Sequence, residues 1–147
     1  MWQRFNNFIS SLTTYRALSP DLRVRRQVNQ RLRRRPALSV EQWFETFYQP
    51  QGMTYSVVAF AYQQLPLYSG LDIARVLPDD HLYEDLCWAQ VCWFDWQLNL
   101  CEDFCHHFGI EESDSLALSD CLEKTTLFTI RDLIALLNTY GVRSLGC

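Results

Sequence analysis

Residues 77–110 read LPDDHLYEDLCWAQVCWFDWQLNLCEDFCHHFGI, and the expected fold depends mainly on this stretch. It begins with a polar loop and becomes a long apolar segment, with three of the five tryptophans and four of the six cysteines of the chain. From Trp88 to Phe108 the apolar residues recur at helical spacing on two neighbouring stripes. A helix that is apolar so far around must be covered on several sides. We therefore expect one long buried helix over residues 88–108, with Gly109 as its C-cap.

The composition favours an all-α protein with a packed core. Of the 147 residues, 48% are hydrophobic, whereas five glycines and five prolines are few for a loop-rich β architecture. No apolar run reaches about 18 residues, so we expect no membrane-spanning helix. The N-terminus lacks the continuous apolar region of a secretory signal. Six cysteines without such a signal indicate free thiols in a reducing, cytoplasmic compartment.

Charge divides the chain into a basic arm and an acidic body. Residues 1–38 carry nine arginines against Asp21, a balance of +8, and residues 39–147 carry four lysines and arginines against sixteen acids, a balance of −12. An arm of this kind can dock on its own body, on an acidic partner, on nucleic acid or on an anionic membrane surface. We therefore divide the chain into a basic helical extension, 1–38, and a helical bundle domain, 39–147.

Helix signals precede the long apolar segment. The spacing of apolar residues over 1–18 predicts an amphipathic helix, and Ser19-Pro20 opens a second helix that ends at Arg35. Ser39 opens a third helix. Residues 54–65 favour a helix, although β-branched and aromatic residues leave a strand open there. Pro66 and Gly70 predict a turn, followed by an ordered loop as far as residue 85.

Two further helices are expected after the apolar segment. Residues 115–124 form a short helical pattern. Thr129 then caps a final helix, with Asp132 in the third position of a capping box. Gly141 is the expected end of that helix.

From Val57 to Gly141, the order of these segments resembles the acyl carrier protein fold, a four-helix bundle with a long first loop. The segments that resemble the family are FAYQQL (60–65), VLPDDHLYEDL (76–86), CEDFCHHFGI (101–110) and LFTIRDLIALL (127–137). The resemblance covers about 85 of the 147 residues. It implies an all-α, four-helix acyl-carrier-like bundle over about 54–141 with additional N-terminal helices, akin to uncharacterised acyl-carrier-like proteins of bacteria.

The chain departs from that family at the cofactor attachment site. The family carries phosphopantetheine on the serine of an Asp-Ser-Leu triplet just after Glu-Asp-Leu. Here Glu84-Asp85-Leu86 is followed by CWAQV, so that counting places Gln90 or Phe94 where the serine would stand. Neither side chain can accept a phosphodiester. Ser115 does lie in an Asp-Ser-Leu triplet, but after the central segment, where we interpret it as a helix cap. We expect no bound cofactor.

Cys101 and Cys105 are a candidate metal or redox pair. They are four residues apart, so their thiols lie on one face of a helix, and His106 is adjacent. Zinc prefers four such ligands in tetrahedral geometry, but the two-residue spacings of zinc knuckles are absent. Because both cysteines belong to the apolar stripe, we interpret them as core residues. A Cys/His nucleophile needs an exposed thiolate and an oriented base, which the sequence does not indicate, so we expect no enzyme.

These observations favour a non-enzymatic protein-interaction or assembly module. The alternatives are an acyl or peptidyl carrier, or accessory factor of acyl chemistry, and a small metal- or thiol-redox protein that uses Cys101 and Cys105. The expected partner is a protein, either an acidic one or a second copy in a homodimer. The region Arg23–Arg35 has no aromatic residue, so no DNA binding is expected, while peripheral contact with an anionic membrane stays open. The candidate partner-binding residues are Arg31, Arg33, Arg34, Arg35 and Trp88.

Overall fold

The computed structural model describes residues 19–124, 126 and 129–145, and over these residues the chain is all-helical. The described part contains no strand, apart from one isolated antiparallel bridge between His81 and Thr129. The predicted all-α class is confirmed. Among the same residues, no helix is long and apolar enough to cross a membrane. The helix expected over 1–18 lies outside the described residues.

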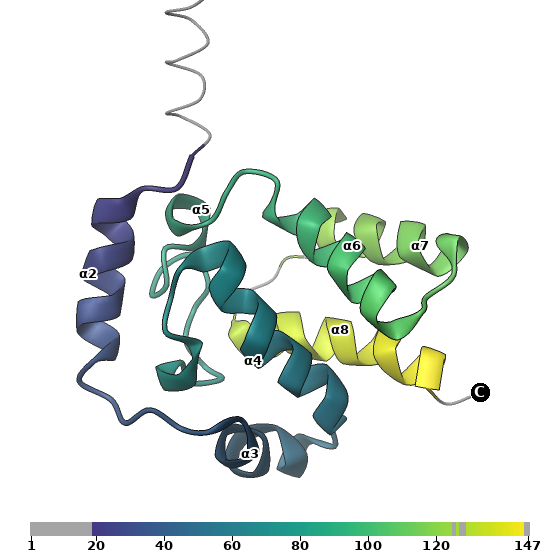
Figure 1. Ribbon diagram of the computed structural model, residues 1–147, viewed down its shortest axis with the longest axis horizontal. Helices are drawn as coiled ribbons and strands as arrows, with labels where there is room; N and C mark the ends of the chain where they lie inside the picture. Colours follow the sequence, from purple (N-terminus) through teal and green to yellow (C-terminus); the bar gives the residue numbers. More distant parts are fainter. Residues whose placement is uncertain (1–18, 125, 127–128, 146–147) are drawn as a thin grey trace, which may run out of the picture.

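The helices follow one another with short connections, except for the long loop between α4 and α5. In chain order they are α2 (Leu22–Leu32), α3 (Val40–Trp43), the π-helical turn η1 (Phe44–Tyr48), the 3-10 turn η2 (Gln49–Gln51), α4 (Tyr55–Ser69), the 3-10 turn η3 (Ile73–Arg75), α5 (Trp88–Val91), α6 (Trp96–Phe108), α7 (Glu112–Lys124) and α8 (Ile130–Leu145). Helix α2 stands at one end of the molecule, and the hairpin of α6 and α7 stands at the other (Figure 1).

The core lies between α4, α6 and α8. Phe60 of α4 packs edge-on against Phe104 of α6, with ring centroids 5.3 Å apart. Gly141 of α8 is buried, and a β-carbon placed on it would lie 2.5 Å from Cγ2 of Val57. The apolar side chains that α4 and α8 bury are Val57, Val58, Phe60, Ala61, Leu65, Ile130, Leu133, Ile134 and Leu137.

Two capping boxes are present: the sequence predicted the one at Thr129, and for Ser39 it predicted only a helix start. The Ser39 hydroxyl accepts the Gln42 N–H, and the Gln42 side chain accepts the Ser39 N–H. At the start of α8, the Thr129 N–H donates to Asp132 at 3.0 Å and the Asp132 N–H donates to the Thr129 hydroxyl at 3.2 Å. Each box satisfies backbone donors that have no partner within their helix. Gly109 also ends α6 as predicted, in the left-handed conformation.

The single helix predicted over 88–108 is wrong. Residues 92–95 separate α5 from α6, and Cys92 has an extended backbone. In a continuous helix, residues eight apart would be displaced by about 12 Å along the axis. The break instead brings the buried rings of Trp88 and Trp96 to a centroid distance of 5.8 Å, nearly perpendicular to each other. The apolar stripe that includes Phe94 and Leu98 is not fully covered, because these side chains are 66% and 55% exposed.

Helix α4 and the loop after it also differ from expectation. Residues 54–65 are helical, but the helix continues through Pro66 to Ser69. Pro66 lies in the last turn, so its missing N–H affects one bond near the helix end. The turn predicted at Pro66 comes at Gly70, which is left-handed and whose N–H donates to the Pro66 carbonyl at 2.8 Å.

The ends of three other helices differ from the positions that the sequence predicted. Asp21, rather than Ser19, caps α2, because its carboxylate accepts the N–H groups of Arg23 and Val24. That helix ends at Leu32, three residues before the predicted end. Helix α7 begins three residues earlier than expected, which places Ser115 inside it rather than at its cap. Helix α8 continues past Gly141 to Leu145.

The Gly141→Ala substitution tests the contact between α4 and α8. The added methyl group overlaps Val57, so we expect a loss of about 1–3 kcal/mol in the free energy of unfolding, as for other overpacked cores. In a Val57→Ala background the overlap is gone, and alanine then gains up to about 1 kcal/mol from its helix propensity. Urea unfolding of the single and double variants measures both changes. An equal cost in the two backgrounds would contradict the assigned contact.

Candidate functional site

Helix α2 is bound to the long loop between α4 and α5. The Asn29 side-chain amide donates to the Gly70 carbonyl at 3.0 Å, and its oxygen accepts the Asp72 N–H at 2.9 Å. Beyond the loop, Nε of Arg25 donates to the carbonyl of Val91, the last residue of α5, at 2.8 Å. Side chains of α2 therefore satisfy backbone groups that a loop cannot pair within itself.

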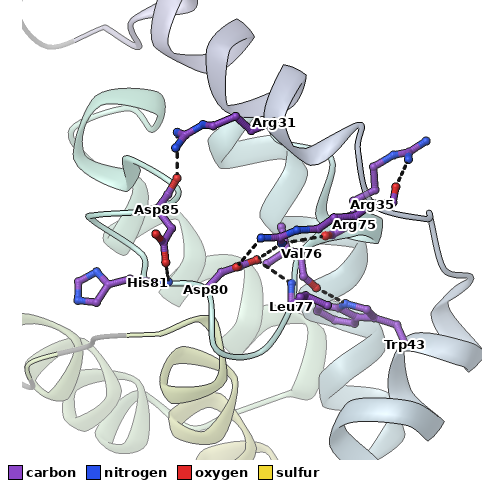
Figure 2. Close-up of polar contacts among 9 residues, drawn as sticks. All are labelled: Arg31, Arg35, Trp43, Arg75, Val76, Leu77, Asp80, His81 and Asp85. Atoms are coloured by element: carbon purple, nitrogen blue, oxygen red, sulfur yellow. Dashed lines mark hydrogen bonds and ion pairs between the residues drawn. The ribbon is translucent and has the colours of Figure 1, made fainter.

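Asp80 is the centre of these contacts. Its carboxylate accepts two hydrogen bonds from the Arg35 guanidinium, at 2.6 and 3.0 Å, and a third from the Leu77 N–H at 2.7 Å (Figure 2). Its carbonyl accepts the Ile130 N–H from the start of α8 at 3.2 Å. Asp80 is only 7% exposed, so hydrogen bonds from its partners must replace the water contacts that this carboxylate has lost. The hydrogen bond with Asp80 raises the pKa of Arg35 above its ordinary value.

A second layer of polar contacts surrounds that pair. Nη1 of Arg75 donates to the carbonyls of Arg33 and Arg35, while Nη1 of Arg35 donates to the Arg75 carbonyl at 3.3 Å. The indole N–H of Trp43 donates to the Val76 carbonyl at 2.9 Å, and both residues are buried (Figure 2). These bonds fix the end of α2, the turn η3 and the helix α3 in one arrangement.

The turn after Asp80 is closed by its own side chains. Nδ1 of His81 accepts the N–H groups of Tyr83 and Glu84, at 3.2 and 3.1 Å, and the His81 N–H donates to the Asp85 carboxylate at 2.7 Å. Nη2 of Arg31 reaches the Asp85 carbonyl at 3.1 Å. The acidic segment around Glu84 and Asp85 is thus a hydrogen-bonded turn.

The predicted partner-binding residues fall into two groups. Arg35 is engaged with Asp80, and Trp88 is completely buried, so Trp88 cannot serve as the surface anchor that the sequence suggested. Arg31 is exposed and also bonds the loop. Arg33 and Arg34 are exposed, and their side chains make no hydrogen bond or ion pair with the described part of the body. Among the described residues, no carboxylate pairs with the guanidinium of Arg33 or Arg34.

The outward face of α2 contains two arginines that our candidate residues left out. Arg23 and Arg26 are exposed, and they lie ten and seven residues before Arg33, so all three share one helical face. No described carboxylate pairs with them either. Helical periodicity was the signal that could have identified them. Their inward neighbour Arg25 bonds the end of α5.

The candidate metal and redox residues lie between α6 and α7. Cys101 is 3% exposed and Cys105 is 8% exposed, whereas the neighbouring His106 is exposed to solvent. Burial raises the pKa of Cys101 to about 11, and it also raises the pKa of Cys92 far above its ordinary value. These thiols are therefore protonated at neutral pH, the opposite of an activated nucleophile. Within the described parts of the chain, no group of three or more potential ligands could hold a metal ion.

The three positions considered for cofactor attachment, Ser115, Gln90 and Phe94, lie in different parts of the structure. Ser115 is half-buried and faces α6, with its Oγ 3.9 Å from the Cys101 sulfur. Gln90 lies on α5, and Phe94 lies in the break before α6. Cys87, directly after Glu-Asp-Leu, has a φ of 53°, and among the described residues it is the one non-glycine residue in the left-handed region.

Comparisons with known proteins add no assignment. No protein-family model matches the chain, and neither the curated proteins nor the solved structures that were searched contain a match.

Thiol labelling tests the buried-cysteine account. In the folded protein at pH 8, we expect iodoacetamide to modify half-buried Cys87 faster than Cys92 or Cys101, because the thiolate is the reactive form. The labelling rate of Cys101 should keep rising with pH toward about 11, since its pKa is raised by burial. Peptide mass spectrometry after timed labelling measures each site. Rapid labelling of folded Cys101 at pH 7 would restore the thiol-redox interpretation.

Proposed function

We propose that this protein is a non-enzymatic interaction or assembly module that binds an acidic protein surface through the outward face of α2. One observation carries the proposal: the polar residues of α2 divide into two sets with different uses. The inward set bonds the loop and the body. The outward set is exposed, and among the described residues none of its guanidinium groups pairs with a carboxylate. The outward set is Arg23, Arg26, Arg33 and Arg34.

The charge of this segment supports an acidic partner. Residues 21–35 contain seven arginines against Asp21, a balance of +6. Arginine suits carboxylates because its planar guanidinium can donate two parallel hydrogen bonds to one carboxylate. Exposed ion pairs contribute only about 0–1 kcal/mol each, and salt weakens them. Leu22, 64% exposed at the start of the same helix, offers an apolar contact that salt does not screen.

The chemistry of the remaining polar groups favours binding over catalysis. The buried thiols of Cys92 and Cys101 have raised pKa values, and the acidic turn around Glu84 uses its polar groups on its own backbone. The cytoplasmic location stays a prediction, based on the free thiols. Cys87, Cys92, Cys101, Cys105 and Cys121 are all free.

We also infer that residues 54–141 are a degenerate acyl-carrier-like bundle. The order of α4, a long loop with η3, α6, α7 and α8 supports this inference. Two features depart from the family: the central helix is broken after α5, and α7 is as long as α6, with 13 residues each. A carrier fold without its attachment serine keeps a helical surface for protein contacts and loses the acyl chemistry.

Neutralising the outward arginines tests the proposed binding. We compare the wild type with a variant that carries Arg23→Gln, Arg26→Gln, Arg33→Gln and Arg34→Gln, by affinity capture from native lysate and quantitative mass spectrometry. Specific acidic partners should fall at least tenfold with the variant, because its helix has lost the charges that face outward.

The matched control carries lysine at the same four positions. It keeps the charge, and it should retain most of the captured partners at low salt. Urea unfolding must give similar midpoints for all three proteins, since these side chains make no described contact with the body. Equal capture by the wild type and the glutamine variant would overturn the proposal.

A further inference from the structure

We propose that the acidic surface bound by α2 is helix α7 of a second copy of this chain, so that copies associate head to tail. This inference rests on the proposed function and names its partner. It is based on three features of one chain: an acidic helix with an exposed leucine, an apolar hollow beside basic residues, and the location of the two at opposite ends.

Helix α7 has an apolar anchor surrounded by carboxylates. Leu116 is 67% exposed, and Glu112 and Asp120 lie one turn before and one turn after it on the same face. The opposite face of α7 is held in the core by Leu118 and Leu122, so Leu116 cannot turn inward. Residues 111–124 carry five carboxylates against Lys124, a balance of −4. Lys124 pairs with Asp120 at 3.1 Å, which leaves the charge of Glu112 uncompensated in the described chain.

The end of α2 has a hollow of the right size for that anchor. Its volume is about 140 Å³, and Pro36, Leu38, Phe47, Val76 and Leu77 contribute to its apolar walls. Cavities of about 150 Å³ with apolar walls accept a benzene-sized group, so one leucine side chain fits. Leu77 is 40% exposed, which leaves it available to a partner.

Basic residues adjoin this hollow. Arg35 and Arg75 contribute to its lining but are engaged with Asp80 and Asp72. Arg33 and Arg34, immediately before Arg35 in the chain, are exposed. A leucine with a carboxylate one helical turn away would thus enter an apolar hollow whose lining includes Arg35 and Arg75, and the exposed Arg33 and Arg34 lie next to Arg35 in the chain. The leucine is complementary to the apolar hollow, and the carboxylate is complementary in charge to the arginines.

The two surfaces cannot meet within one molecule. Helix α2 and helix α7 stand at opposite ends, with α4 and α6 between them (Figure 1). Contact between them therefore requires two copies. Because the contact joins different surfaces, every added copy leaves one basic end and one acidic end free, and growth continues unless a ring closes.

Two variants that each lose one end test this arrangement. The basic-end variant carries Arg33→Gln and Arg34→Gln, and the acidic-end variant carries Glu112→Gln and Leu116→Gln. All four side chains are exposed, so both variants should fold, which urea unfolding checks. Sedimentation velocity of the full chain at low salt is run up to about 0.5 mM, where even an association with a Kd near 1 mM is populated.

We expect the wild type to form species larger than a dimer, which dissociate as salt increases. Each variant alone should sediment as a monomer. Their equimolar mixture should form a heterodimer and nothing larger, because the acidic-end variant supplies an intact α2 and the basic-end variant supplies an intact α7.

Three results would overturn the inference: a wild type that stays monomeric, variants that associate as the wild type does, or a mixture that stays monomeric while the wild type associates. A monomeric wild type whose capture of another acidic protein still requires the outward arginines would reject the second copy and leave the proposed function standing. If the wild type neither self-associates nor captures an acidic protein through the outward arginines, both proposals are rejected.

Discussion

The ion pair between Arg35 and Asp80 joins three distant parts of the chain. Asp80 accepts Arg35 from the end of α2 and the Leu77 N–H of its own loop, and its carbonyl accepts Ile130 at the start of α8. A buried carboxylate that loses its partner is strongly destabilising, although an intact buried pair adds little to stability by itself. The pair therefore specifies where α2 ends and how it lies on the body, so that these three parts adopt one arrangement together.

The same arrangement determines which arginines remain for function. The sequence shows one basic arm, but Arg25 satisfies the Val91 carbonyl at the end of α5 and Arg35 satisfies the buried carboxylate of Asp80. What is left is a stripe along the outer face of α2, and the acidic helix α7 lies at the other end of the molecule (Figure 1). A chain with a net charge of −4 thus has two ends of opposite sign. This separation of charge is the physical basis of both proposals.

Sequence patterns predicted the features that a few neighbouring residues decide. The capping box at Thr129 depends on side chains three residues apart, and it is present; Ser39 was predicted to start a helix, and it does. Features decided by distant contacts were missed. The break after α5 accompanies the packing of Trp88 on Trp96, and Gly141 is required by the approach of Val57 rather than by a helix end. Likewise, nothing within residues 31–35 distinguishes Arg35 from its neighbours, because its partner Asp80 is forty-five residues away.

Native-state amide hydrogen exchange in Arg35→Gln and Arg34→Gln tests most directly whether this ion pair holds α2 on the body. Both variants remove one guanidinium from the same turn, but only Arg35 contacts Asp80. We expect Arg35→Gln to increase exchange of the Leu32 and Leu77 amides by about 10- to 100-fold, because a hydrogen bond to a charged group is lost. Arg34→Gln should leave both amides at the wild-type rate. Equal protection in the two variants would contradict the central role of the Arg35–Asp80 pair.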